Sequence, residues 1–287
     1  MNGAIIINKP AGITSRDVIN RLNRILEIKE IGHTGTLDPM ATGVLICLIG
    51  RATKLTNILT NQDKEYIASF KLGILTDTLD VTGKIITEEK VDVTDEKIRE
   101  VLNSFIGSYE QEVPKYSAVK VNGKKLYEYA RNNEDVILPK RNITIYKLDL
   151  LSIEKEIITI KVKVSKGTYI RSLVRDIGSS LGTHATLTNL ERTEVGNFNI
   201  QNSVTLEEVL ENKYHLYTVP ELLKDYPSEE IDPEMLFKVR NGRIFDREIK
   251  DYLLFTVNNQ EMALYEKYND NQIKPSVMFY IKEDTSN

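Results

Sequence analysis

Residues 32–50, GHTGTLDPMATGVLICLIG, combine a glycine-rich turn, a single carboxylate and a long apolar segment. Pro39 follows the carboxylate of Asp38 and biases Asp38 towards an extended conformation, which disfavours a helix interior. The segment therefore predicts a loop that enters a buried strand. Loops at strand ends often carry catalytic groups, so Asp38 is a candidate nucleophile or base. The structural alternative is an Asp that accepts hydrogen bonds from the amides of its own turn.

The same stretch lacks the patterns of phosphate and metal chemistry. No window of it supplies the G-x-x-x-x-G-K-[ST] pattern of a P-loop. An aspartyl-phosphate loop would need its Asp where His33 stands, ahead of Thr34, Gly35 and Thr36. The histidines are far apart in sequence, and the chain has no H-E-x-x-H or C-x-x-C pattern. We therefore expect neither phosphoryl transfer nor a metal site.

Charge is distributed unevenly along the 287 residues, whose net charge is −4. Residues 201–287 carry 17 acidic and 10 basic residues, whereas the first 200 carry 28 basic and 25 acidic residues. Two segments, 115–125 and 161–171, each contain four basic residues and no acidic one. This pattern suits a polyanion that binds the first two-thirds of the chain, or lysines on solvated strand faces.

The chain has the composition of a soluble globular protein, with 41% hydrophobic and 28% charged residues. No apolar run approaches the roughly 20 residues that span a bilayer, and the N-terminus lacks the basic region of a signal peptide. The single Cys47 lies in an apolar run and cannot form an internal disulfide. We expect a cytoplasmic protein with no membrane partner.

Hydrophobic periodicity predicts an α+β fold without a regular βαβ alternation, and hence a mixed, largely antiparallel sheet flanked by helices. Ser15 is the expected N-cap of the first helix, and Gly182 the expected end of the last. The expected strands are residues 4–8, 43–49, 64–73, 143–154 and 157–165. The expected helices are residues 15–28, 51–60, 94–107 and 168–182. A small, more acidic unit is expected to begin near 202–220.

Six blocks resemble, in order, the motifs of the TruB family of bacterial tRNA pseudouridine synthases, which modify the uridine of the TΨC loop. GHTGTLDPMATGVL resembles the catalytic motif of that family. The others are NKPAGITS (8–15), KEY (64–66), GILTDTLDVTG (73–83), VPKYSAVKVNGKKLYEYAR (113–131) and SKGTYIRSLVRDIG (165–178). The match covers roughly residues 4 to 200, and the C-terminal unit matches weakly.

This resemblance implies a pseudouridine-synthase-like catalytic domain over residues 1–205 and a small, PUA-like C-terminal domain over 206–287. A thumb-like RNA-binding insertion is expected at 113–142, where Asn122-Gly123 also predicts a hairpin turn. The implied activity is the isomerisation of uridine to pseudouridine at position 55 of tRNA after base flipping. It needs no cofactor. We expect tRNA as the partner, no obligate protein partner, and a monomer.

The resemblance also implies a task for each site residue. Asp38 is the catalytic nucleophile or base, Arg171 keeps it ionised and oriented, and Tyr66 stacks on the uracil and assists the proton that leaves C5. His33 is expected to enter the region that the flipped base leaves. The remaining expected substrate-binding residues are Tyr169, Lys9, Pro10, Asp80, Leu190, Lys120, Lys124 and Lys125.

The sequence departs from the family pattern in places. Val113 replaces the first of two prolines, Asn132 stands near a frequent glycine, and Thr186 stands near a frequent histidine. These changes affect the expected insertion and the packing under the pocket rather than the nucleophile. A non-catalytic tRNA-binding or tRNA-folding protein on the same scaffold is the alternative function. A guide-RNA-dependent relative is a third option, for which neither terminus offers an obvious docking extension.

Overall fold

The computed structural model describes residues 1–280. The apolar segment after Asp38 forms strand β3 (Thr42–Ile49), which is buried from Gly43 to Ile49. It pairs antiparallel with β1 (Gly3–Lys9) over its whole length. Its other edge is divided, because β2 (Ile31–Thr34) pairs with its far end and β12 (Ala185–Val195) runs parallel to its first two residues. The predicted buried strand is therefore present.

The rest of the main sheet is antiparallel and continues from β12. The order is β12, β4 (Lys64–Leu72), β11 (Ile157–Val164), β10 (Lys140–Glu154) and β7 (Gly107–Glu112). Alternate residues of β4 are buried, which is the pattern of a strand with one face on a core. The predicted α+β class, with a mixed and largely antiparallel sheet, is confirmed.

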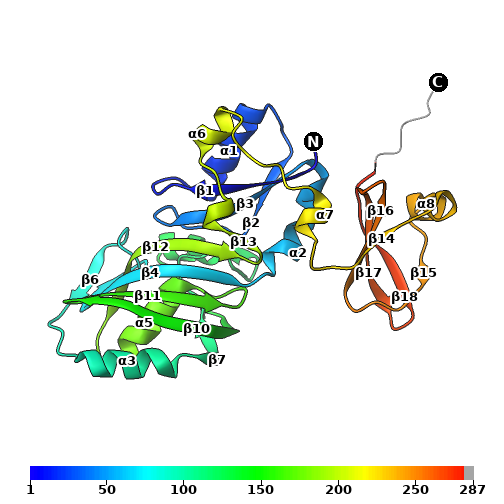
Figure 1. The fold of residues 1–287 in the computed structure, drawn as a ribbon. Coiled ribbons are helices and arrows are strands. Elements are labelled where there is room, and N and C mark those ends of the chain that lie inside the picture. The colour runs from blue at the N-terminus through cyan, green and yellow to red at the C-terminus, as the bar shows by residue number, and fades with distance from the viewer. Residues whose placement is uncertain (281–287) are drawn as a thin grey trace.

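Helices pack against this sheet through their apolar faces. Figure 1 shows α5 (Ile170–Ser180) and α3 (Asp95–Ser104) on one face of the strands β4, β11 and β10. Their apolar residues join the core formed by those strands. Helix α1 (Ser15–Leu26) packs instead against β1 and β3. Its N-cap is Thr14, whose side chain accepts a hydrogen bond from Asp17 N, so the prediction that Ser15 caps this helix is wrong.

Shorter elements complete the main body. A 3₁₀ helix, η1 (Gly50–Leu55), leads into α2 (Thr56–Thr60), and β5 (Ile74–Thr76) forms a hairpin with β6 (Ile85–Glu88). The segment between β7 and β10 contains β8 (Lys120–Val121), β9 (Lys124–Lys125) and α4 (Leu126–Arg131). Asn122 and Gly123 join β8 to β9 with φ of 50° and 82°, as a type I′ hairpin turn requires.

The chain then returns to the first strands before it forms a second sheet. Beyond β12 the chain forms four short elements, β13 (Phe198–Asn199), η2 (Ile200–Asn202), α6 (Leu206–Leu210) and α7 (Val219–Leu222). Val204, before α6, and Tyr217, before α7, each form a β-bridge with β1. The second sheet has the order β14 (Ser228–Glu230), β16 (Tyr252–Val257), β17 (Gln260–Asn269), β18 (Gln272–Met278) and β15 (Phe245–Asp246).

The second sheet and helix α8 (Pro233–Arg240) lie beside the main body in Figure 1. Leu254, Leu264 and Val277 of this sheet share a hydrophobic core with β3 and α7. Arg51 donates to the carbonyl oxygen of Tyr280 at 2.7 Å. No helix among residues 1–280 is long and apolar enough to cross a membrane.

Candidate active site

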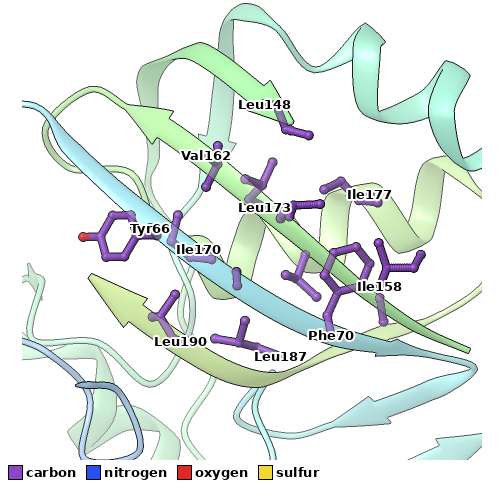
Figure 2. Close-up of a cluster of buried hydrophobic side chains, with 14 of the residues drawn as sticks. Tyr66, Phe70, Leu148, Ile158, Val162, Ile170, Leu173, Ile177, Leu187 and Leu190 are labelled. Carbon is purple, nitrogen blue, oxygen red and sulfur yellow. The ribbon is translucent and has the colours of Figure 1, made fainter. Parts of the chain in front are cut away.

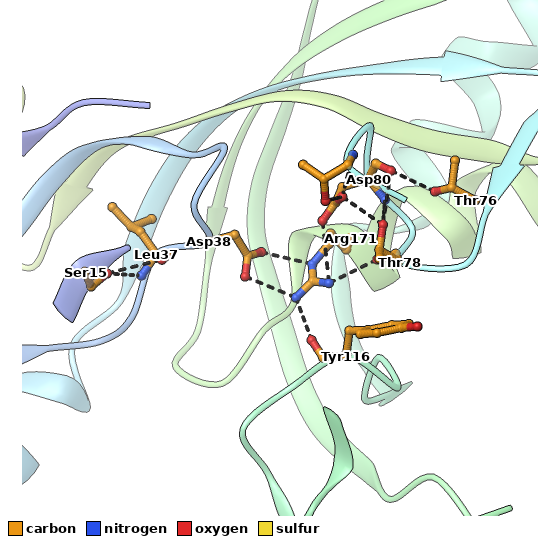
Figure 3. Close-up of polar contacts among 9 residues, drawn as sticks. Ser15, Leu37, Asp38, Thr76, Thr78, Asp80, Tyr116 and Arg171 are labelled. Atoms are coloured by element: carbon orange, nitrogen blue, oxygen red, sulfur yellow. Dashed lines mark hydrogen bonds and ion pairs between the residues drawn. The ribbon is translucent and has the colours of Figure 1, made fainter. Parts of the chain in front are cut away.

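The loop between β2 and β3 holds Asp38 in a fixed position. The backbone of Leu37 donates to Ser15 Oγ at 2.9 Å, and the same hydroxyl donates back to Leu37 O at 3.2 Å. On the other side of Asp38, Pro39 O accepts a hydrogen bond from Gly12 N at 2.8 Å. Residues from the first helix and the turn before it therefore clamp both neighbours of Asp38. Figure 3 shows the Ser15–Leu37 contact next to the carboxylate.

Arg171, in the first turn of α5, forms a two-point contact with Asp38 (Figure 3). Its Nε lies 3.0 Å from Asp38 Oδ2, and its Nη2 donates to Asp38 Oδ1 at 3.2 Å. This geometry is the fork that guanidinium groups make with carboxylates. The Asp38 carboxylate is thus paired with a cation from a distant part of the chain. The alternative of a carboxylate engaged only by its own turn does not hold.

The remaining donors of Arg171 also have acceptors. Nη1 donates to Thr78 O at 3.0 Å and lies 3.7 Å from Asp80 Oδ2, while Nη2 donates to Tyr116 O at 3.0 Å. The Arg171 side chain is only 7% exposed, against 34% for that of Asp38. The guanidinium is therefore immobilised, and only its partner carboxylate is open to a ligand.

Burial raises the pKa of the Asp38 carboxyl above its usual range. The Arg171 guanidinium opposes this shift, the negative charge of Asp80 adds to it, and Lys9 opposes it weakly. Arg171 therefore offsets only part of the desolvation cost. The carboxyl is a stronger base than an exposed Asp, which suits a group that must accept a proton or attack carbon.

Asp80 lies behind Arg171 and outside the residues that line the cavity at Asp38. Its Oδ1 accepts hydrogen bonds from Thr78 Oγ1 at 2.8 Å and from Thr82 N at 2.9 Å. Only 4% of the residue is exposed. In the structure, Asp80 orders the turn after β5 and supplies a second negative charge to Arg171.

Asp38 opens into a cavity of about 450 Å³ between the main sheet, α5 and the insertion. Tyr66 and Leu190, from the adjacent strands β4 and β12, form its apolar wall, and Figure 2 shows the Tyr66 hydroxyl directed away from the hydrophobic cluster. Tyr169 also lines the cavity, and burial raises the pKa of its phenol. Its backbone N–H donates to Gln111 Oε1 at 2.8 Å, which fixes the start of α5. A planar base can be stacked against these side chains.

Lys9 and Pro10 do not line this cavity in the described structure. Lys9 is fully buried, and its ammonium donates to Ile13 O at 2.7 Å, Pro10 O at 2.8 Å and Pro39 O at 3.2 Å. Burial lowers the pKa of Lys9 to about 8. In the structure Lys9 positions the Asp38 loop through Pro39. Pro10 is exposed beside it.

His33 lies on β2 opposite Cys47 and also outside the cavity lining. Its Nδ1 is buried and has no hydrogen-bond partner among the described residues. Burial lowers the pKa of the imidazole, and the nearby charges of Arg192 and Arg16 lower it further. The structure thus presents a half-buried imidazole at this edge, whose Nδ1 is enclosed by protein atoms.

The insertion closes one side of the cavity, because Tyr116, Ser117, Ala118 and Tyr127 all line it. Of its three expected RNA-binding lysines, Lys120 is exposed and free of ion pairs among residues 1–280. Lys124 pairs with Glu134 at 2.6 Å and lies 4.6 Å from the Tyr129 ring centroid. Lys125 donates to the Tyr127 hydroxyl at 3.3 Å.

Two charged cavity residues were missed by the sequence analysis, namely Lys64 and Arg192. Both are buried, at 7% and 1% exposure. Each lies two residues from a wall residue on the same strand, Tyr66 or Leu190, and strand alternation places such residues on one face. That signal was available for Lys64, whose strand the sequence predicted, but not for Arg192, because no strand was predicted over residues 185–195. Within residues 1–280, no three His, Cys, Asp or Glu side chains are grouped so as to hold a metal ion.

Comparison with known proteins agrees with this geometry. The model of the TruB family pseudouridylate synthase N-terminal domain matches residues 23–170, and that of the tRNA pseudouridylate synthase B C-terminal domain matches residues 171–226. The tRNA pseudouridine synthase B of Clostridium tetani is 43% identical over 255 residues, which is 88% of each chain. That of Fusobacterium nucleatum is 50% identical over 201 residues, or 70% of each chain.

Solved structures with the same fold come from larger assemblies. One is described as the structure of an H/ACA RNP bound to a substrate RNA containing 2′-deoxyuridine, and its TM-score is 0.73 at 23% identity, covering 98% of this chain and 86% of the other. A Cbf5-Nop10-Gar1 complex gives a TM-score of 0.73 at 24% identity, over 96% and 83% of the two chains. At such identities the likeness concerns the fold alone. On the family models and the close relatives, the chain belongs to the TruB family of tRNA pseudouridine synthases.

Proposed function

We propose that this enzyme isomerises the uridine at position 55, in the TΨC loop of tRNA, with Asp38 as its nucleophile or base. The observation that carries the proposal is the Asp38–Arg171 fork at the bottom of a cavity walled by Tyr66 and Leu190. The cavity provides a reactive carboxylate, a cation that holds it, and a flat apolar wall. These are the groups that a reaction at the junction of a sugar and a pyrimidine requires.

The reaction breaks the N1–C1′ bond, turns the uracil, and forms a C5–C1′ bond. Asp38 can start it by attack on the base, by attack on C1′, or by removal of a ribose proton. In each route Arg171 keeps the carboxylate oriented, since its fork fixes both oxygens. Tyr66 stacks on the uracil, and its hydroxyl takes part in the removal of the proton from C5.

A uridine stacked in the tRNA elbow is enclosed by its neighbours and cannot present its glycosidic bond to Asp38 inside a cavity of about 450 Å³. The target base is therefore flipped out, and His33 enters the region of the loop that it leaves. Lys120, Lys124 and Lys125, interleaved with tyrosines, bind the RNA backbone on the other side. The same proposal has the enzyme act in the cytoplasm as a monomer, without a cofactor or a protein partner.

The test is to incubate the purified chain with unmodified tRNA transcripts and to map pseudouridine at single-nucleotide resolution. Modification of the TΨC-loop uridine alone is the expected result. A transcript with cytidine at that position serves as the matched control and should remain unmodified. Modification at another uridine would contradict the assigned position. Tight tRNA binding without any pseudouridine would favour a tRNA-folding function on the same scaffold.

A further inference from the structure

Arg192 is a buried cation whose charge is balanced neither by the fold nor by the Asp38 reaction. It is 1% exposed and lies on β12 directly opposite Tyr66 of β4. Within residues 1–280, no carboxylate lies within 4 Å of its guanidinium. Its charge lowers the pKa of His33 and of Lys64, so its field reaches across this part of the molecule. A buried charge without a counter-ion is costly, which indicates that a ligand supplies one.

The guanidinium uses only part of its donor set. Nε donates to Val44 O at 2.8 Å, and Nη2 donates to Gly35 O at 3.1 Å. No acceptor for Nη1 exists among residues 1–280, and Arg192 is part of the cavity lining. Nη1 lies 3.5 Å from the point where a Cβ on Gly35 would stand. A Cβ at position 35 would therefore be in ordinary van der Waals contact with this nitrogen, which places Gly35 and Nη1 side by side in the cavity lining.

Lys64 brings a second cation to the same place. Its Cε lies 3.9 Å from the same Cβ position on Gly35. Its ammonium donates to Thr60 O at 2.7 Å and to Gln62 O, and it has no ion-pair partner among the described residues. Burial and the charge of Arg192 lower its pKa to about 8. An anion bound between the two groups would stabilise the charged form of both.

The cavity lining thus has two halves. Tyr66 and Leu190 make the apolar half. Lys64 lies two residues before Tyr66 on β4, Arg192 lies two residues after Leu190 on β12, and together they make the cationic half. Asp38 lines the same cavity. We propose that Arg192 and Lys64 form a subsite for one phosphodiester group of the RNA strand that carries the target uridine. This inference rests on the proposed function, because it takes the target nucleotide to occupy the Asp38 cavity.

The chemistry of the subsite fits a phosphate better than a carbonyl or a base edge. A guanidinium presents paired N–H groups to two oxygens of one phosphate, and an ammonium adds a point charge. With the uracil on Tyr66 and the glycosidic bond at Asp38, a neighbouring phosphate reaches the cationic half. The subsite would set the direction of the nucleotide in the cavity, so that C1′ and not the far edge of the base faces the carboxylate.

The test measures RNA affinity with TΨC stem-loops that carry one neutral methylphosphonate at successive linkages of the loop. For the wild-type chain we expect a loss of about ten-fold or more in affinity at one linkage next to the target uridine. For Arg192→Gln, the affinity for RNA with a methylphosphonate at that linkage should be within about two-fold of its affinity for the unmodified RNA. Arg192→Lys keeps the charge and should keep the sensitive linkage, which a purely structural role would not explain.

Controls keep the outcomes distinct. Arg99→Gln, an exposed residue of α3, should leave the pattern of sensitive linkages unchanged. If thermal melting shows that Arg192→Gln is unfolded, Lys64→Gln takes its place and should weaken the same linkage effect. Equal methylphosphonate penalties in wild type and variants would overturn the subsite while pseudouridine formation stands. No binding of the stem-loop by the wild type, and no modification of tRNA, would overturn the proposed function and the subsite together.

Discussion

Replacing Arg171 tests whether this guanidinium sets the charge and the direction of Asp38. Arg171→Met removes a permanent positive charge whose Nε and Nη2 lie 3.0 and 3.2 Å from the two Asp38 oxygens. An opposite charge this close lowers a carboxyl pKa by roughly 1–3 units. Burial already raises the pKa of Asp38, and the loss of the Arg171 charge should raise that pKa further by about this amount.

The sign of the effect on rate follows from the reactive form. The reaction needs the ionised carboxylate, so the rate falls when the pH drops below the pKa of Asp38. If that pKa is raised, the fall begins at a higher pH. The acidic limb of the pH–rate profile should therefore move up by about 1–3 pH units in Arg171→Met. Arg171→Lys keeps the charge but loses the fork, so it should be slow at every pH and should gain much less when the pH is raised.

The assay is the single-turnover rate against pH, with the enzyme in excess over tRNA and well above the dissociation constant, so that weaker binding does not mask the chemistry. Arg171→Met also strands Asp80, which is 4% exposed, and breaking a buried pair can cost about 3–5 kcal/mol of stability. The double variant Arg171→Met/Asp80→Asn removes that stranded charge and serves as the folding control. Flat profiles for both single variants would refute the reasoning and leave Arg171 as a packing residue.

Tyr66, the lysines of the insertion and Lys9 each allow a separate test. Tyr66→Phe keeps the stacking surface and loses the hydroxyl, so the single-turnover rate should fall by about 10²-fold or more while the tRNA dissociation constant stays within a few-fold; a wild-type rate would exclude a role in proton transfer. Changing Lys120, Lys124 and Lys125 to Ala should flatten the salt dependence of tRNA binding by roughly 0.7 to 0.9 log–log units for each lost phosphate contact. An unchanged slope would show that these lysines, two of which contact Glu134 or Tyr127 in the free chain, do not bind phosphates. Lys9→Met should lower the free energy of unfolding by roughly 1–3 kcal/mol in urea titrations, because three carbonyl oxygens lose their buried donor; unchanged stability together with weaker tRNA binding would instead make Lys9 a substrate contact.

The position of Asp38 could be predicted from the sequence because local patterns determine it. A Gly-rich turn, Asp-Pro and a continuous apolar run together specify a loop that enters a buried strand, and β3 begins at Thr42, one residue before the predicted start at Gly43. Gly43 shows why the turn pattern is strict, since its φ is +100° and a Cβ there would lie 2.2 Å from Arg192 O. The pairing of Asp38 with Arg171, 133 residues away, came from the family resemblance and not from any local pattern.

The parts of the site that sequence reasoning did not place depend on tertiary packing. Ser15 has the residue type of an N-cap, yet its hydroxyl is engaged with the backbone of Leu37, and Thr14 takes the capping role. Lys9 was expected among substrate-binding residues, whereas its ammonium lies among backbone carbonyls. Arg192 was overlooked because no strand was predicted over residues 185–195, and a charged residue is ordinarily exposed; the pairing of β12 with β4 buries it.

The most direct test of the central claim is the turnover of Asp38→Asn, which keeps the shape of the side chain and removes its charge. Purified wild type and Asp38→Asn would be compared in the same reaction with unmodified tRNA, with pseudouridine at the TΨC-loop position and the tRNA dissociation constant both measured. We expect the variant to bind tRNA within a few-fold of wild type and to form no pseudouridine over the time in which wild type completes the reaction. Multiple turnover by a clean preparation of Asp38→Asn would contradict the assignment of Asp38 as the reactive group.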